Sequence, residues 1–504
     1  MTAAAPAVSD PPIEPPADPP PLDDAAVKRI ITGVMIAMFL AALNQTIIAT
    51  ALPTIGRSLG DFANLAWVVT AYLLAATVVS PLYGKLADAY GRRIMLMAAI
   101  GVFTVGSVVA ALAPDMLTLI VGRGLQGIGG GGIFPLAQTI ISDVVAPRER
   151  GRYQAYIGIV WVAAGLGGPV VGGVLAEHGH WSMIFWSNLP LGVAVAATTW
   201  RSLARLPRFD RPHRIDWLGA ALMTIASISF LLALGWGGTR VPWFSPTIFA
   251  LVAASALFSG LLVWRLATAA EPFLPPAILS NPVVRLGTLA SAGAVSTPMG
   301  LTIFLPLYYE TVHGLSAAMA GFALVPIALV SAPGSILSSR FMMFRLGYKL
   351  VPVLGYAAAV AAAAALVALP DASLAVVIAL LCVISFGAGT AIPVCTVCIQ
   401  NAVAPHQVGT ATGVMNFIRA LAGSLLVAAM GAIVLAGFGA VPERGGAGAA
   451  TAAAHLASAD AAHVFRWLFA AAAVTLAIGL VALIRMEERP LAGPGPRGKA
   501  NGTP

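Results

Sequence analysis

Apolar runs of about 20 residues recur along the whole chain, and they restrict its fold more than any other feature. Fourteen such segments lie between residues 30 and 485 of the 504-residue sequence. A helix of about 20 apolar residues spans the hydrocarbon core of a bilayer. Only 10% of the residues are charged and 59% are hydrophobic, whereas a soluble domain carries roughly 25% charged residues. The sequence therefore predicts an all-α polytopic membrane protein.

The positions of the basic residues predict how these segments cross the membrane. The predicted spans are 30–52, 64–83, 94–113, 116–141, 153–176, 181–200, 215–236, 244–267, 286–309, 317–339, 350–369, 374–398, 408–435 and 464–485. If the N-terminus is cytoplasmic, 22 of the 28 Lys and Arg residues fall on the inner side, as the positive-inside rule requires. One span more or fewer would invert every later loop. We therefore expect fourteen spans and two cytoplasmic termini.

Composition divides the chain into five parts. Residues 1–27 form a proline-rich acidic leader that we expect to be disordered and that lacks the pattern of a signal peptide. We expect a six-helix half at 28–210, two inserted helices at 211–270, a second six-helix half at 271–490 and a cytoplasmic tail at 491–504. The segment Gly334 to Lys349 is a weak echo of a charged motif at the same place in the first half, which indicates an internal repeat.

Charge and cysteine content exclude some other functions. The net charge of +8 does not indicate nucleic-acid binding, because the bases are spread between the apolar runs. Cys395 and Cys398 form a CxxC, but neither a histidine nor a second cysteine pair accompanies them. They predict small side chains in a helix interface rather than a metal site. Arginine outnumbers lysine 24 to 4, a bias typical of GC-rich bacteria, and so we expect the bacterial inner membrane.

A cluster of glycines and charges, GKLADAYGRRIML, lies between the second and third predicted spans at Gly84 to Leu96. Charges are costly inside hydrocarbon, so this turn must lie at the inner membrane surface, where Asp88 can pair with Arg92, Arg93 or a base of another helix. The string closely resembles the signature of the major facilitator superfamily between its second and third helices. The resemblance implies a major facilitator fold with a cytoplasmic latch. The latch residues would be Gly84, Asp88, Gly91, Arg92 and Arg93.

Four further strings resemble the fourteen-span drug:proton antiporter branch of that superfamily. They are LNQTIIATALPTI from Leu43, LIVGRGLQGIGGGG around Arg123, GLGGPVVGGVL from Gly165 and NFIRALAGS around Arg419. The third resembles the motif taken as the mark of antiporters. Its glycines permit close helix packing and its proline bends a helix, which predicts a hinge or a tight seam. The residues concerned are Gly165, Gly168, Pro169, Gly172 and Gly173.

The resemblance implies that proton coupling involves Asn44, Arg123 and Arg419. A buried arginine must meet carbonyls, a carboxylate or water, so Arg123 is either a functional contact or a structural tie between helices. Relatives usually carry an aspartate where Asn44 stands, and an amide cannot carry a proton. Three explanations stay open: coupling through another acid, uncoupled transport or uncharged cargo, and a substitution that traps one state. Glu310 is the nearest alternative acid, unless it is only a solvated rim residue.

An apolar, aromatic cavity is the predicted substrate path. Its candidate residues are Gln126, Gln138, Trp161, Phe304, Tyr308, Tyr309 and Asn416. Aromatic walls with few polar groups suit bulky amphipathic ligands, although aromatic side chains in membrane helices also face lipid or pack the core.

We thus expect a transporter that works by alternating access and exports hydrophobic or amphipathic compounds by proton antiport. The alternative is a dedicated exporter of one metabolite or self-made antibiotic, with altered coupling because of Asn44. We expect a monomer in the lipid bilayer whose energy source is the proton gradient, with no cofactor or metal. A membrane enzyme would need clustered acids or a metal set at the membrane surface, and a sensor would need an appended soluble domain. The sequence indicates neither, so we do not expect an enzyme or a sensor.

Overall fold

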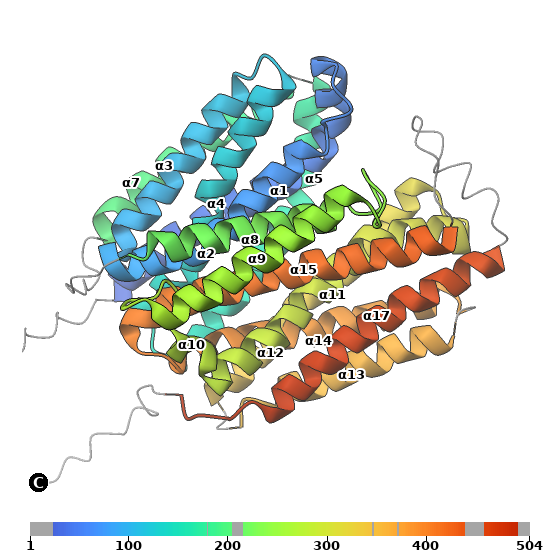
Figure 1. Ribbon diagram of the computed structural model, residues 1–504. Helices are drawn as coiled ribbons and strands as arrows, with labels where there is room; N and C mark the ends of the chain where they lie inside the picture. The colour runs from blue at the N-terminus through green and yellow to red at the C-terminus, as the bar shows by residue number, and fades with distance from the viewer. Residues whose placement is uncertain are drawn as a thin grey trace, which may run out of the picture.

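The computed structural model describes residues 24–178, 180–203, 215–344, 347–369, 372–438 and 458–491. Residues 1–23 of the predicted leader, 204–214 at the predicted boundary between the first six-helix half and the inserted helices, and 492–504 of the predicted tail lie outside these ranges. Within them the elements are helices, apart from one isolated bridge between Gly237 and Val241. Figure 1 shows the helices arranged as a large bundle.

The helices follow the predicted spans closely. Those of the first part are α1 (Asp24–Leu59), α2 (Trp67–Tyr90), α3 (Arg92–Ala111), α4 (Met116–Val144), α5 (Arg150–His178), α6 (Met183–Trp186) and α7 (Asn188–Ser202). The inserted pair is α8 (Trp217–Trp236) and α9 (Pro246–Thr268). The last part contains α10 (Pro276–Ser280), α11 (Pro282–His313), α12 (Ala317–Phe344), α13 (Leu350–Ala368), α14 (Leu374–Asn401), a 3₁₀ turn (Pro405–Gln407), α15 (Val408–Phe438) and α17 (Ser458–Arg485).

Twelve helices in the described part of the chain are long and apolar enough to cross a membrane. The other two predicted spans correspond to α4 and to the pair α6 and α7. The 29 residues of α4 would extend about 44 Å at 1.5 Å per residue, but its glycines lower the hydropathy. The predicted span 181–200 is interrupted at Ser187, and Pro190 follows in the first turn of α7, where proline is tolerated.

Two helical groups with separate apolar cores make up the bundle. In the first, side chains of α1 to α4 pack around Met38, Phe103 and Ile133. In the second, α11, α13, α14 and α17 pack around Tyr356, Leu381 and Leu476. Each group buries its own apolar side chains.

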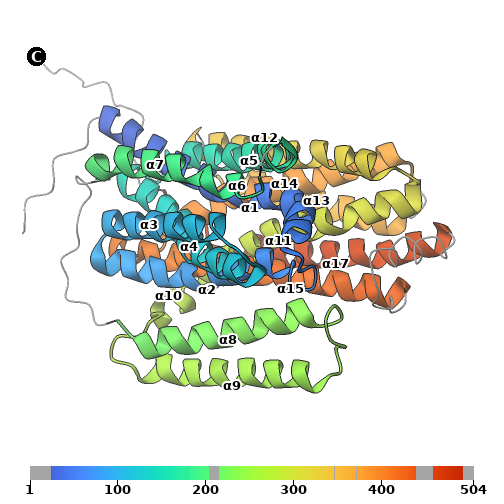
Figure 2. The ribbon, with the colours of Figure 1, turned by 90° about the horizontal axis from the view of Figure 1, so that it is seen from above.

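The inserted hairpin of α8 and α9 lies outside both groups, along one flank of the bundle (Figure 2). Helix α8 contacts α2 of the first group and α15 of the second. Helix α9 packs mainly on α8 and exposes large apolar side chains such as Leu257 and Trp264, each 60% exposed. An exposed apolar face of this kind suits contact with lipid.

Candidate functional site

The charged motif joins α2 to α3 through a single residue. Helix α2 continues to Tyr90 and α3 begins at Arg92, so only Gly91 lies between them, with a φ of 92° that favours glycine. The predicted turn of charged residues is therefore shorter than expected: it consists of Gly91 alone, and the charged residues belong to the two helices. Asp88 belongs to α2 and is only 5% exposed, because α15 covers it.

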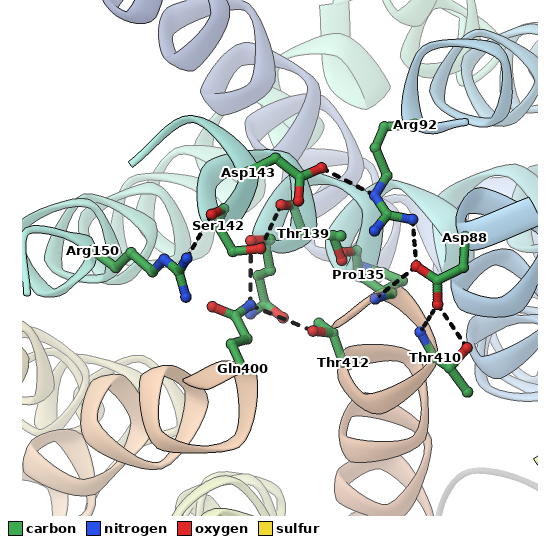
Figure 3. Close-up of polar contacts among 12 residues, drawn as sticks. Asp88, Arg92, Pro135, Thr139, Ser142, Asp143, Arg150, Gln400, Thr410 and Thr412 are labelled. Carbon is green, nitrogen blue, oxygen red and sulfur yellow. Dashed lines mark hydrogen bonds and ion pairs between the residues drawn. The ribbon is translucent and has the colours of Figure 1, made fainter. Parts of the chain in front are cut away.

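Asp88 binds the first residues of α15, in the other half of the molecule (Figure 3). Its carboxylate accepts hydrogen bonds from the backbone N–H of Gly409 at 3.1 Å and of Thr410 at 2.7 Å. The Thr410 hydroxyl donates a third at 2.7 Å. The N-terminus of a helix carries unsatisfied N–H groups and a partial positive charge. The carboxylate therefore caps α15, and we call this contact the Asp88 latch.

Arg92 holds the carboxylate of the latch from the other side. Its guanidinium forms an ion pair with Asp88 and another with Asp143 of α4, at 3.1 Å (Figure 3). Arg93 does not join them, because its guanidinium lies over the ring of Trp200, 4.0 Å from the centroid. Of the predicted partners, Arg92 is thus the one that contacts Asp88.

Glycine allows the two helices to meet at the latch. A Cβ on Gly84 would collide with the backbone carbonyl of Gly409, and a Cβ on Gly409 would collide with the Asp88 carboxylate. Ser80, one turn further along α2, donates a hydrogen bond of 3.3 Å to the carbonyl of Gly413. The α2–α15 seam is therefore closed over at least two helical turns.

Amide side chains make a second contact between the halves. Asn416 of α15 donates to the side-chain oxygen of Gln138 at 2.9 Å. Gln400 of α14 reaches the backbone carbonyl of Gln138 at 3.3 Å and the Thr412 hydroxyl at 3.4 Å (Figure 3). Gln138 and Asn416 were predicted to lie together in a cavity, and the structure does bring them together, but as a contact between halves. Sequence reasoning missed Gln400 and Thr410.

Arg123 lies in a buried polar cluster inside the first half. It is 1% exposed and donates to the Val68 carbonyl at 2.9 Å and to the Gln126 side chain at 2.8 Å. Its guanidinium also lies 4.5 Å from the ring centroid of Tyr72, a cation–π distance. In the described part of the chain, no carboxylate lies within ion-pair distance of Arg123.

Asn44 completes this cluster. Its side-chain oxygen accepts from Asn188 at 3.1 Å and from Gln126 at 3.4 Å, and Gln126 also donates to Ser107 at 2.7 Å. The Nδ2 group of Asn44 is buried and has no hydrogen-bond partner. Asn44 and Arg123 thus lie in one network bridged by Gln126, and none of the side chains that the structure joins in it is a carboxylate.

The other two coupling candidates lie elsewhere. Arg419 of α15 is 5% exposed and donates to the Thr396 hydroxyl at 3.0 Å, while its Nε lacks a partner. Glu310 is exposed near the end of α11. The structure does not bring Arg419 or Glu310 into the network of Asn44.

The glycine motif of α5 packs against α1 through two of its residues. A Cβ on Gly168 would meet Thr46, and one on Gly172 would meet the carbonyl of Ile47. Gly165 and Gly173 have open space around them, and Pro169 is exposed. The close packing expected of the motif is found at Gly168 and Gly172, and α5 continues through Pro169.

A cavity of about 570 Å³ lies between α2, α8, α11 and α15. Of the predicted aromatic residues, Phe304 lines it. Trp161 instead stacks on Phe134, with ring centroids 5.0 Å apart. Tyr308 and Tyr309 differ from the prediction: both are buried in the core of the second half, where Tyr308 packs on Phe465. They do not line this cavity.

The three cysteines form neither a disulfide nor a metal site in the described part of the chain. Cys395 and Cys398 are buried and free, and Cys382 is half-buried and free. No group of three or more potential metal ligands occurs among the described residues.

These features define a polytopic membrane protein built from two helical halves that meet at a buried charged contact. The chain matches the Major Facilitator Superfamily over residues 34–427 and belongs to that family.

Two relatives and one solved structure show what the chain is similar to. It is 34% identical over 412 residues to the uncharacterized MFS-type transporter Rv1877 of Mycobacterium tuberculosis (strain ATCC 25618 / H37Rv). The aligned region covers 80% of this chain and 59% of that protein. This chain therefore spans about three fifths of that relative. It is 30% identical over 406 residues to the multidrug transporter protein MdtP of Bacillus subtilis (strain 168), with 80% and 75% covered. The human organic anion transporter MFSD10 shares the fold, with a TM-score of 0.61, 18% identity and 89% and 99% coverage.

Proposed function

We propose that this transporter exports hydrophobic or amphipathic compounds from the cytoplasm of a bacterium by proton antiport. It would be a monomer with fourteen spans and two cytoplasmic termini in the inner membrane. The similarity to the multidrug transporter MdtP and to relatives named efflux pumps supports export. The observation that carries the proposal is the Asp88 latch, which joins α2 to α15 at one end of the molecule while a cavity separates the same helices further along.

The arrangement suits alternating access. The positive-inside rule assigns the latch end to the cytoplasm, because Lys85, Arg92 and Arg93 gather there. In the described structure the halves touch at this end through α2 and α15, and also through α5 and α12, where Gly151 packs on Met342. Export then requires the latch to break, so that the cytoplasmic end opens and cargo enters.

Proton coupling must work without an acid at position 44. Asn44 is held by Asn188 and Gln126 in a network centred on Arg123. We propose that this network transmits movement between α1, α2 and α4, while a carboxylate elsewhere carries the proton. Glu310 is the candidate for that carboxylate, because it is exposed at the predicted outer end of α11.

The second candidate function is the dedicated export of one metabolite or self-made antibiotic. The amide at Asn44 favours it, because a cluster that holds the Arg123 guanidinium and no carboxylate does not attract cationic compounds. The two functions predict different behaviour of a deletion strain. A drug pump protects against many compounds, whereas a dedicated exporter leaves most sensitivities unchanged.

The test is dye transport in inside-out membrane vesicles energised with a proton gradient, with and without an uncoupler. Proton antiport predicts dye accumulation that collapses when the uncoupler is added. Accumulation that is insensitive to the uncoupler would contradict antiport, and no accumulation of any dye in a broad panel would contradict multidrug export.

A further inference from the structure

The cavity beneath α8 lies to the side of the bundle, between its two halves. Helix α2 supplies one wall, α11 and α15 of the other half supply the opposite wall, and the inserted α8 covers it. Its lining runs from Thr77 to Thr70 on α2 and from Ser424 to Leu435 on α15. On the predicted topology this is the stretch from mid-membrane to the outer surface.

The inserted hairpin is fastened where it covers this seam. At the outer end, Arg240 donates to the carbonyl of Ala63 at 2.9 Å, and Trp236 packs edge-on against Trp67 with centroids 6.0 Å apart. At the inner end, Asp216 caps α8 and pairs with Arg265 of α9 at 2.9 Å, which joins the two helices of the hairpin. Ala220 and Met223 of α8 pack there in one apolar cluster with Val414 of α15. The hairpin is thus a fixed cover and not a loosely associated pair of helices.

The chemistry of the lining indicates what the cavity can hold. None of the residues that line it is charged, and most are apolar, including Leu73, Leu234 and Phe304. Trp243 also lines the cavity, and its Nε1 is buried without a hydrogen-bond partner. A buried donor without a partner is costly, so an occupant whose oxygen reaches this N–H, once the indole turns away from Gly238, gains from the contact. A hydrocarbon tail of a lipid cannot supply one.

We propose that this cavity is a lateral binding site for uncharged amphipathic cargo, with the apolar body against α2, α11 and α15 and an acceptor oxygen towards Nε1 of Trp243. The proposal rests on the export function proposed above and specifies its cargo. Because the walls belong to different halves, rocking of the halves changes the width of the site. Cargo would therefore leave sideways, under α8, towards the outer leaflet.

The experiment uses Nile red, an uncharged dye with a carbonyl oxygen, and the purified full-length protein in nanodiscs. Gly431→Leu fills the cavity, because a Cβ on Gly431 has room and only meets the ring of Phe304 at 3.5 Å. Trp243→Phe keeps an aromatic ring but removes the N–H together with the five-membered ring, a loss of volume that Trp264→Phe reproduces. The matched controls are Gly260→Leu and Trp264→Phe on α9, where Gly260 has open space and Trp264 is 60% exposed.

We expect Gly431→Leu to weaken Nile red binding at least tenfold in titrations corrected with empty nanodiscs. Trp243→Phe should weaken it about fivefold, the equivalent of one neutral hydrogen bond. Both controls should match the parent. Gradient-driven Nile red transport in vesicles should fall in the same order.

Three results would overturn the proposal. Equal binding in the parent and Gly431→Leu would place the dye elsewhere, while the export function would stand if the parent still transports it. Binding that depends on Gly431, without gradient-driven transport of any compound by the parent, would remove the cargo role together with the export function. A phospholipid seen by native mass spectrometry in the parent, lost in Gly431→Leu and not displaced by Nile red, would make the cavity a lipid site.

Discussion

Replacing Asp88 by asparagine tests the latch most directly. Four donors converge on the carboxylate: two backbone N–H groups and a hydroxyl from Gly409 and Thr410, and the guanidinium of Arg92. The amide oxygen of an asparagine can accept only some of these bonds, and its NH₂ group then faces the remaining donors. The substitution preserves the size of the side chain, so folding and membrane insertion should be largely intact.

The cost falls on the state in which the latch is closed. A hydrogen bond to a charged group contributes about 1.5–3 kcal/mol, and losing two of them costs about 3 kcal/mol. That is near the lower end of the 3–5 kcal/mol expected for breaking a buried ion pair. A change of about 3 kcal/mol shifts the ratio of closed to open states about 100-fold. Since transport requires both states in turn, we expect Asp88→Asn to abolish it.

A cysteine in the α2–α15 seam reports that shift. Ser80 is 5% exposed and contacts Gly413, so in a background without the native cysteines Ser80→Cys should react slowly with a maleimide. Adding Asp88→Asn should speed labelling about 100-fold, following the population of the open state. Asp115→Asn is the matched control, since Asp115 caps α4 through Thr118 away from the seam. An unchanged transport rate in Asp88→Asn, or lost transport with unchanged labelling, would refute the latch.

Three further substitutions test the coupling residues. Arg123→Ala should abolish dye transport. Arg123→Lys should still lower the transport rate at least about tenfold, the equivalent of one charged hydrogen bond, because lysine lacks the planar fork that reaches Gln126 and covers Tyr72. Near-normal rates in the lysine variant would mean that Arg123 acts only as a generic positive charge. Asn44→Asp should make transport of cationic dyes faster and more sensitive to external pH, measured across a pH series. Glu310→Gln should remove the remaining proton dependence, and identical pH profiles in the parent and both variants would exclude proton handling at either site.

Much of the helical fold could be predicted because the bilayer imposes a simple length rule on apolar segments. The ends of the helices were less predictable. The motif was expected to be a surface turn, since charges are excluded from hydrocarbon. The structure satisfies this rule differently: α2 continues through Asp88, and the charge is covered by the N-terminus of α15 and by Arg92.

The partners of Asp88 could not be read from the sequence. Thr410 lies 322 positions away, and the groups that bind the carboxylate are mainly backbone amides, which leave no residue pattern. The aromatic residues illustrate a second limit. The sequence marked Tyr308 and Phe304 equally as cavity residues. Both lie on α11, but only Phe304 faces the cavity, whereas Tyr308 packs into the core. The direction in which each side chain points depends on the helices that pack around α11.

The latch and the lateral cavity are connected through α2. The inner end of α2 is tied to α15 by Asp88, while its outer part forms one wall of the cavity opposite the same helix. Because the two helices are stiff, separating them at the latch brings them together at the cavity. Cargo that occupies the cavity then stabilises the closed latch, and by linkage the closed latch must strengthen cargo binding by the same factor. Nile red should therefore slow the labelling of Ser80→Cys in the parent and leave it unchanged when Gly431→Leu fills the cavity. A dye that binds at the cavity without slowing the labelling would show that the two ends of α2 move independently.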